Sequence, residues 1–599
     1  MSEGIIMIIS GIYWRNSERK NLLASLNNAT TAKIKDKVTY LESKNFNIIA
    51  GNTSIHASEC QILKCEGKIL IGTAFSNKDN KKINKSVFYE MSHKREEAFI
   101  KKYWGDYIFI EKNEDTLHIL RSLTGKVSLY YIKTDSGNIV FSSEISILRQ
   151  ILSNEIFFNY EYLSSVFLQS TVPTINTLFI GINELSFGCE LKINQHLFET
   201  NLAWNPLDYC QPFQDEDYFI KKITNTLLST LETLADPLEN ILLEFSGGLD
   251  SSALLLCLKH ILRDNQKLTA INIFDSSVES SNERIHAKKI AKEAGIDLIE
   301  VDFSNSLPFS FSERLNYQPN KPSLGFKLLK LDQKMAHIAQ NYKGARFISG
   351  HGGDHIFMCP PPIESLVDLV IDKNFNLKQK LTELSLHYRE PFYPLLKIAF
   401  KNYFLYLCGF PYKSLIFNSY TTPPWIKDEV HTLSKMIRMH PFYEIKNKRV
   451  PPGKFSQINA IYNGLTSIKK CVINENNPIL YPLFTQPMLE LALSAPSYKL
   501  YSKEFDRYHL RKAIHNLFNT ESVWRTDKGS ILGVIQLGFR KNIKKITELC
   551  LEGNFAREGL IEKDLLWENI KKAASGHSNQ NVLFLDQLVN LEMFLTYWE

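Results

Sequence analysis

The sequence predicts an α/β protein in two parts, a β-rich sandwich followed by a doubly wound parallel sheet. Up to about residue 210, short apolar runs alternate with turn-like polar segments, which is typical of antiparallel strands. From about residue 215, apolar runs alternate with helical patterns, which is typical of parallel strands joined by crossover helices. Glycine-rich turns follow two of the later runs, at the strand ends where such sheets bind ligands.

The composition is that of an ordinary folded protein of more than one domain. Of 599 residues, 44% are hydrophobic and 22% charged. The 70 basic and 64 acidic residues are interspersed, so the net charge of +6 does not indicate a nucleic-acid or membrane partner. The nine cysteines include no Cys-x-x-Cys pair and are expected to be reduced thiols. With no signal peptide and no apolar stretch of ~20 residues, we expect a cytoplasmic protein without a membrane span.

The first part contains several apolar runs with the lengths of strands. They are residues 5–9, 69–75, 107–110, 117–120, 130–132 and 139–141. Polar turns at 112–115 and 135–138 would join the last four runs into two hairpins.

The second part alternates strands and helices. Its apolar runs are residues 241–243, 268–274, 297–301 and 345–348, and a helical pattern at 283–294 ends at Gly295. Strands separated by helices predict a parallel, doubly wound sheet.

The turn after the first of these runs indicates a phosphate site. It reads Glu244-Phe245-Ser246-Gly247-Gly248-Leu249-Asp250-Ser251-Ser252. Glycines permit close backbone approach, and the N–H groups at a helix start bind anions. Asp250 adds a carboxylate that suits Mg²⁺ beside a phosphate. No Gly-Lys-Ser/Thr follows, so this is not a Walker A loop, and a strand–helix turn without a ligand is the alternative.

The turn after the fourth run reads Ser349-Gly350-His351-Gly352-Gly353-Asp354. Because parallel strands end at the same edge of a sheet, we expect the two turns to converge. Asp250 and Asp354 would then share one site, as Mg²⁺ escorting a polyphosphate requires. Taken alone, Asp354 would be a turn or cap residue.

These stretches resemble known families. Residues 246–251 are similar to the pyrophosphate loop of ATP pyrophosphatases. Residues 104–107, Arg121, Gly125, 129–131 and 141–144 resemble the αββα glutaminase domain of class II amidotransferases. Residues 349–354, 481–484, 506–513 and 524–529 resemble the synthetase domain of asparagine synthetase, which has an adenine nucleotide α-hydrolase-like fold. We therefore expect a glutamine amidotransferase-like domain at 1–210 and a synthetase domain at 211–599.

The first domain departs from that family at the nucleophile. Ser2 stands where the glutaminases carry a cysteine, and no cysteine precedes Cys60. The Arg-Gly-Pro-Asp stretch that holds glutamine is also missing. We expect a degenerate glutaminase fold that serves as a scaffold or docking surface.

The synthetase resemblance implies ATP and Mg²⁺, and activation of a carboxylate by adenylation. The implied binding residues are Ser246, Gly247, Gly248, Ser251 and Ser252 for pyrophosphate, Phe245 and Ile273 for adenine, Ser349 and Gly350 for the nucleotide, and Asp250 and Asp354 for the metal. Lys528 would place a positive charge near the adenylate. His351 stands where asparagine synthetase has a glutamate. It could deprotonate an attacking amine, with Glu383 or Glu390 as acidic partner, or it could be structural.

Two further features depart from asparagine synthetase: the turn reads Gly352-Gly353-Asp354-His355 where that family has an Asp-Glu pair, and Gln486-Pro487 replaces an acidic/basic pair. Together with Lys321-Pro322-Ser323, Pro423-Pro424-Trp425 and Pro451-Pro452-Gly453-Lys454, they resemble the lasso-peptide cyclases. That family activates an acidic side chain of a leader-trimmed peptide, and the peptide's N-terminal amine closes a macrolactam ring. The implied partners are a precursor (core) peptide, a leader peptidase and a leader-recognition protein. The aromatic segment 392–417 could line a peptide-sized cavity or form a helical core.

Three alternatives remain open from the sequence. The chain could be an ammonia-dependent asparagine synthetase, a β-lactam synthetase-like enzyme, or a binding protein that kept the fold without activity.

Overall fold

The computed structural model covers the whole chain, and most of it can be described. The described residues are 7–14, 19–34, 39–42, 45–52, 61–92, 99–124, 127–151, 157–210, 213, 215–310, 318–323, 325–374, 376–409, 422–445, 449–468, 479–527, 529–577 and 581–599.

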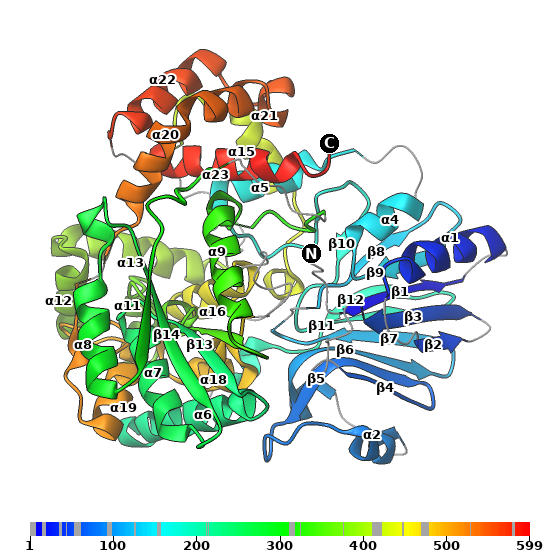
Figure 1. Ribbon diagram of the computed structural model, residues 1–599, viewed down its shortest axis with the longest axis horizontal. Coiled ribbons are helices and arrows are strands. Elements are labelled where there is room, and N and C mark those ends of the chain that lie inside the picture. The colour runs from blue at the N-terminus through cyan, green and yellow to red at the C-terminus, as the bar shows by residue number, and fades with distance from the viewer. Residues whose placement is uncertain are drawn as a thin grey trace.

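The N-terminal part is a sandwich of two antiparallel sheets (Figure 1). The first sheet has the strand order β10-β8-β9-β1-β3-β2, and the second has the order β12-β11-β7-β6-β5-β4. Both predicted hairpins are present, as the pairs β6–β7 and β8–β9. The strands are β1 (Met7–Tyr13), β2 (Thr39–Glu42), β3 (Phe46–Asn52), β4 (Gln61–Cys65), β5 (Lys68–Ser76), β6 (Tyr103–Asn113), β7 (Thr116–Arg121), β8 (Tyr130–Lys133), β9 (Ile139–Ser142), β10 (Asn183–Glu184), β11 (Cys189–Ile193) and β12 (Phe198–Leu202).

Both faces of these sheets are buried, which explains why their strands are continuous apolar runs. In β1, Ile9 and Tyr13 point between the sheets, where they join Ile69 of β5. Ile8 and Ile12 point to the other face and belong to a different hydrophobic cluster. Successive side chains of a strand point to opposite faces, so burial on both sides removes the usual polar alternation.

Helices cover the outer face of the first sheet. α1 (Arg19–Thr31) contacts β1, and α4 (Ile145–Ile151) contacts β9 (Figure 1). The other helices of this part are α2 (Lys85–Ser92), α3 (Phe99–Lys102) and α5 (Tyr160–Gln169). On the outer face of the second sheet, Leu70 and Tyr107 share one hydrophobic cluster with Leu243 and Leu489. The second part of the chain therefore packs directly against this sheet.

The second part is built on a parallel sheet of strand order β15-β14-β13-β16 (Figure 1). Its strands are β13 (Asn240–Glu244), β14 (Lys267–Phe274), β15 (Asp297–Asp302) and β16 (Arg346–Ser349), as predicted to within one or two residues. α6 (Glu216–Ala235) precedes β13, and the helices between the strands are α7 (Leu249–Ile261), α8 (Arg284–Ala294) and α9 (Leu329–Gln340). Gly295 ends α8 in the left-handed conformation, as expected.

The strand order sets the position of a ligand site. The chain moves outward from β13 to β14 and β15, and then returns to the other side of β13 as β16. The order therefore reverses between β13 and β16. Open α/β sheets bind ligands at such a reversal, beyond the carboxyl ends of the strands.

Helices form most of the remaining chain. They are α10 (Gly353–Ile356), α11 (Ser365–Ile371), α12 (Leu377–Tyr388), α13 (Phe392–Leu407), α15 (Asp428–Lys435), α16 (Pro452–Thr466), α18 (Gln486–Ser494), α19 (Tyr508–Phe518), α20 (Leu532–Leu551), α21 (Asn554–Arg557), α22 (Lys563–Ala574) and α23 (Asn581–Leu595). α23 packs back on α5 of the first part (Figure 1). Among the described residues, no helix combines the length and apolar character needed to cross a bilayer.

Helix α13 carries part of the aromatic segment. Leu395 and Ala399 are buried against α11 and α12, whereas Tyr393 is 84% exposed and Phe400 is 67% exposed. One face of this helix is therefore core, and the other faces solvent. Residues 410–417 of the segment lie outside the described residues.

The division into residues 1–210 and 211–599 stays a prediction. It falls between a short 3-10 helix, Pro206–Tyr209, and α6. Two hydrophobic clusters contain residues from both sides of the boundary.

Candidate active site

The two glycine-rich turns leave the sheet side by side. Glu244 of β13 pairs with Ser349 of β16, so both turns begin at the same level of the sheet. α7 starts three residues after Ser246, and the single-turn helix α10 starts at Gly353. The predicted convergence of the two turns is therefore present.

Glycines are what allow these turns to touch. A Cβ on Gly353 would lie 2.2 Å from Oδ1 of Asp250, and a Cβ on Gly350 would lie 2.9 Å from the backbone N of Ser251. Gly247 has φ +77°, and a Cβ there would lie 2.9 Å from the N of Ala287. Larger residues at these positions would push the turns apart.

The first turn presents hydroxyls and a helix N-terminus at the strand end. Ser246 Oγ lies 3.2 Å from Ser251 Oγ and accepts a hydrogen bond of 3.2 Å from Gly248 N. No side chain caps the start of α7. The hydroxyl of fully buried Ser252 has no hydrogen-bond partner among the described residues. A phosphate at this helix start would find donors that the protein itself does not use.

The two predicted adenine-contacting residues lie at the carboxyl ends of the adjacent strands β13 and β14. Ile273 is half-buried near the end of β14. Phe245 is 2% exposed, and its ring belongs to the core. Its backbone O accepts a hydrogen bond of 2.8 Å from Asn272 Nδ2. Phe245 therefore presents little more than its backbone to a ligand.

An arginine joins the two aspartates. Arg507 Nη1 donates to Asp250 Oδ2 at 2.9 Å and also to Asp354 Oδ1, while Arg507 Nε lies 3.0 Å from Asp506 Oδ1. Its side chain is only 7% exposed. Burial disfavours the cation, but the three carboxylates outweigh burial and raise the pKa of Arg507. Arg507 is therefore the counter-charge of both aspartates.

The two aspartates fit a magnesium ion that arrives with phosphate. Mg²⁺ in nucleotide sites takes one or two carboxylates and completes its shell with phosphate oxygens and water. Within the part of the chain that the structure describes, no group of three or more His, Cys, Asp or Glu could hold a metal by itself. In this arrangement, phosphate oxygens and water would supply the remaining ligands. Arg507 lies between the carboxylates, so it would have to share them with the ion.

The side chain of His351 contacts a serine. Its Nε2 lies 3.1 Å from Ser467 Oγ, and Ser467 Oγ donates to Gly464 O at 2.8 Å. This contact orients the imidazole ring, and either tautomer of His351 can make it.

An acidic partner of His351, for which Glu383 and Glu390 are the candidates, stays a prediction. Glu383 is buried and pairs with Lys380 Nζ at 2.6 Å, and Glu390 is exposed. The recorded partner is Ser467, 116 residues along the chain from His351. No local pattern in the sequence connects the two.

Lys528 lies outside the described residues, but its neighbours reach the first turn. Arg525 Nη1 donates to Gly247 O at 3.3 Å, and Arg525 Nη2 pairs with Glu283 at 2.6 Å. Sequence reasoning missed both Arg507 and Arg525 as site residues. Their signal was their place within residues 506–513 and 524–529, the stretches that carry the family resemblance.

Comparisons with known proteins match both parts of the chain. Residues 82–204 match the glutamine amidotransferase domain, and residues 238–387 match asparagine synthase. The chain is 25% identical over 533 residues to the Microcin J25-processing protein McjC of Escherichia coli, a match that covers 86% of this chain and 90% of the relative. The predicted fold class is confirmed: an N-terminal glutamine amidotransferase domain precedes an asparagine synthase domain with a parallel sheet.

Two solved structures resemble part of the chain, both with low TM-scores. The U34-tRNA thiolase NcsA from Methanococcus maripaludis is 20% identical, with a TM-score of 0.19, covering 29% of this chain and 57% of that one. The glutamine phosphoribosylpyrophosphate amidotransferase from B. subtilis is 9% identical, with a TM-score of 0.22, covering 57% of this chain and 81% of that one.

Proposed function

Because the chain belongs to the asparagine synthetase-like family of ATP-dependent amide-forming ligases and is related to its lasso-peptide cyclases, we propose that it closes a macrolactam ring in a leader-trimmed precursor peptide. The observation that carries this proposal is the similarity to the Microcin J25-processing protein, which extends through both parts of the chain. Sequence similarity confined to the synthetase domain would indicate amide formation without favouring any particular amine substrate.

The proposed reaction has two steps. An acidic side chain of the peptide attacks the α-phosphate of ATP, and pyrophosphate leaves. The peptide's N-terminal amine then attacks the acyl carbon, AMP leaves and the amine gives up a proton. The product is an amide within the same peptide. ATP-dependent amide formation is the family's chemistry; the peptide acceptor and the ring are the proposal.

The residues of the two turns have distinct roles in this scheme. The serines and the helix start of α7 bind the leaving pyrophosphate. Asp250 and Asp354 would hold Mg²⁺, which neutralises phosphate charge when bound. Arg525, which contacts Gly247, and Lys528 from the adjoining segment would add positive charge on the phosphate side.

His351 would accept the proton of the attacking amine. Its Nε2 contacts Ser467 Oγ at 3.1 Å, which orients the ring, and the ring nitrogen without a proton would act as the base. Imidazole is the side chain that most often serves as a general base at neutral pH.

Pyrophosphate exchange tests the first step separately from the second. The wild-type protein should exchange labelled pyrophosphate into ATP in the presence of the linear peptide and not in the presence of free aspartate. His351→Gln should keep this exchange and lose ring closure by about 10²–10⁴-fold, as expected for loss of a general base. Equal loss of both activities would contradict the role of His351. Exchange with aspartate, and asparagine formation from ammonia, would replace the proposal with a simple synthetase.

A further inference from the structure

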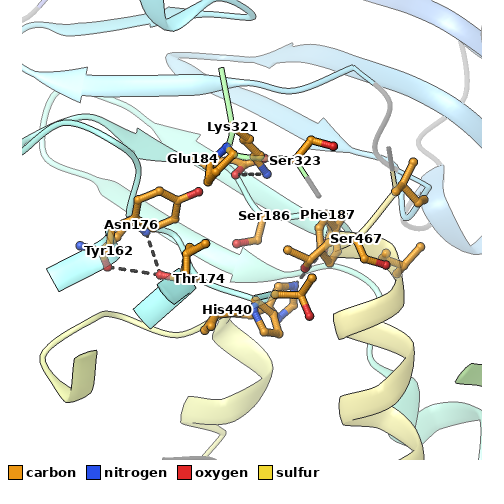
Figure 2. Close-up of a pocket in the computed structure, with 18 of the residues that line it drawn as sticks. Tyr162, Thr174, Asn176, Glu184, Ser186, Phe187, Lys321, Ser323, His440 and Ser467 are labelled. Carbon is orange, nitrogen blue, oxygen red and sulfur yellow. Dashed lines mark hydrogen bonds and ion pairs between the residues drawn. The ribbon is translucent and has the colours of Figure 1, made fainter. Parts of the chain in front are cut away.

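A small cavity separates the two parts of the chain (Figure 2). Its volume is about 70 Å³. The first part contributes Arg121, Glu184 and the segment around Thr174, and the second part contributes Lys321 and the end of α16. One water needs about 10–15 Å³ by this measure, so the cavity has room for a small polar group and not for a folded peptide.

Two cations and one anion line this cavity. Glu184 Oε1 lies 2.6 Å from Arg121 Nη1, and Glu184 Oε2 lies 2.5 Å from Lys321 Nζ, as Figure 2 shows for the lysine. Arg121 is 1% exposed, and Glu184 is 4% exposed. Burial would raise the pKa of Glu184, but the two cations outweigh it and hold that pKa at about 2. Glu184 is therefore ionised and offsets only one of the two positive charges.

The other ionisable side chains of the described lining add no charge. His440 Nε2 donates to Phe187 O at 3.0 Å, and burial lowers the pKa of His440 to about 4, so the ring is neutral. Tyr162 is buried and neutral, since burial raises its pKa. The charged side chains of the described lining are therefore two cations and one anion. Burial and the neighbouring Arg121 lower the pKa of Lys321, although Glu184 favours its charged form.

Hydrogen bonds on both sides of Lys321 fix the position of its backbone. The preceding residue, Asn320, accepts a hydrogen bond of 2.9 Å from Ile145 N through Oδ1. Ser323 O accepts one of 2.8 Å from Asn590 Nδ2. Lys321 is thus tied to the first part on one side and to α23 on the other. The cation is in place before any ligand arrives.

The segment Lys321-Pro322-Ser323 is one of those that carry the resemblance to the lasso-peptide cyclases. Residues of three others are buried or hydrogen-bonded away from the cavity. Gln486 donates to Ile100 O, Lys454 donates to Leu493 O, and Trp425 is fully buried. All three residues of 321–323 line the cavity.

The cavity also reaches the candidate active site. Ser467 lines it (Figure 2), and Ser467 Oγ lies 3.1 Å from His351 Nε2. A group bound in the cavity is therefore one hydrogen-bonded side chain away from the second glycine-rich turn.

We propose that this cavity binds a carboxylate of the peptide substrate against Lys321 and Arg121, distinct from the carboxylate that is activated. That the ligand is a peptide rests on the proposed function. Two cations beside a single carboxylate offer a second carboxylate charge-assisted hydrogen bonds within the lining. Holding a second point of the peptide would limit the directions from which its amine approaches the adenylate. The carboxylate comes either from the peptide C-terminus or from a second acidic side chain.

Small carboxylates test the site without ATP or a precursor. Calorimetric titration of the full chain with N-acetylglycine should show binding, and N-acetylglycinamide should not bind. N-acetylglycine mimics a peptide C-terminus, whereas N-acetyl-aspartate α-amide offers only a side-chain carboxylate. The compound that binds more tightly identifies the source of the carboxylate. Lys321→Met should weaken binding by about 10-fold or more, and Lys321→Arg should retain it.

Lys327→Met is the matched control. Lys327 pairs with buried Asp586 at 2.5 Å, as Lys321 does with Glu184, but it does not line the cavity. This variant loses a comparable ion pair and should bind N-acetylglycine normally. If Lys321→Met fails to fold, Thr171→Phe fills the cavity without changing a charge and should also abolish binding.

Three results would overturn the proposal: equal binding of the acid and the amide, equal weakening by Lys321→Met and Lys327→Met, or binding that survives Lys321→Met and is displaced by ATP. The last result would place the carboxylate in the synthetase site. Because ring closure is not measured here, the cavity proposal and the proposed function can fail separately.

Discussion

At the scale of single residues, Arg507 controls the electrostatics of the candidate metal site. It neutralises Asp250 and Asp354 at once, so its removal leaves two adjacent carboxylates without that cation. We expect Arg507→Gln to lower the melting temperature in EDTA, and Mg²⁺ to raise it more than in the wild type, because the ion replaces the missing positive charge. Thermal unfolding with and without Mg²⁺ measures this difference.

Arg511→Gln is the control for Arg507→Gln. Arg511 pairs with Asp506 at 2.9 Å and has no recorded contact with Asp250 or Asp354. It should lose stability without gaining sensitivity to Mg²⁺. Equal Mg²⁺ shifts in the wild type and both variants would mean that the aspartates do not hold the ion.

Residue-level contacts were the hardest to predict from the sequence. The glycine-rich turns and their aspartates could be recognised, because their chemistry is local. Ser467 as partner of His351, and Arg507 as partner of Asp250, depend on segments more than 100 residues apart. Only the folded chain brings them together.

At the scale of elements, the site depends on two turns that touch through glycine. We expect Gly353→Ala to displace Asp250, to lower the melting temperature and to abolish pyrophosphate exchange, since overpacking typically costs about 1–3 kcal/mol. Gly248→Ala should leave the melting temperature nearly unchanged, because its Cβ would meet only Ser246 Oγ, at 3.2 Å, and its φ is −77°. Equal destabilisation by the two substitutions would contradict the close packing of the turns.

The elements themselves were largely predictable. Buried strands are continuous apolar runs, so all four strands of the parallel sheet and both hairpins could be located from the sequence. The return of α23 onto α5 could not, because an apolar helix does not specify which surface it will cover.

At the scale of the whole molecule, the two parts are joined by buried polar contacts as well as by shared hydrophobic clusters. Trp204 Nε1 donates to Glu490 at 3.0 Å, and Gln486 Nε2 donates to Ile100 O at 2.8 Å. His440 adds a pH-sensitive contact, since its Nε2–H binds Phe187 O in the first part.

The pH dependence of stability tests the contact between His440 and Phe187. Burial lowers the pKa of His440 from 6.5 to about 4, so the unfolded chain binds a proton that the folded chain excludes. The stabilisation is present above pH 6.5 and is lost as pH falls toward 4, by about 3 kcal/mol at most. The melting temperature of the wild type should fall more steeply over this range than that of His440→Gln, which keeps a donor for Phe187. Parallel curves would mean that His440 is not buried in its neutral form.

Ring closure is the central claim, and mass spectrometry tests it most directly. The purified protein would be incubated with the leader-trimmed peptide, ATP and Mg²⁺, and both the peptide and the nucleotide would be analysed. We predict a peptide lighter by one water, resistant to sequencing from its N-terminus, with AMP and pyrophosphate formed in equal amounts. A linear peptide of unchanged mass, or ADP in place of AMP, would contradict the account.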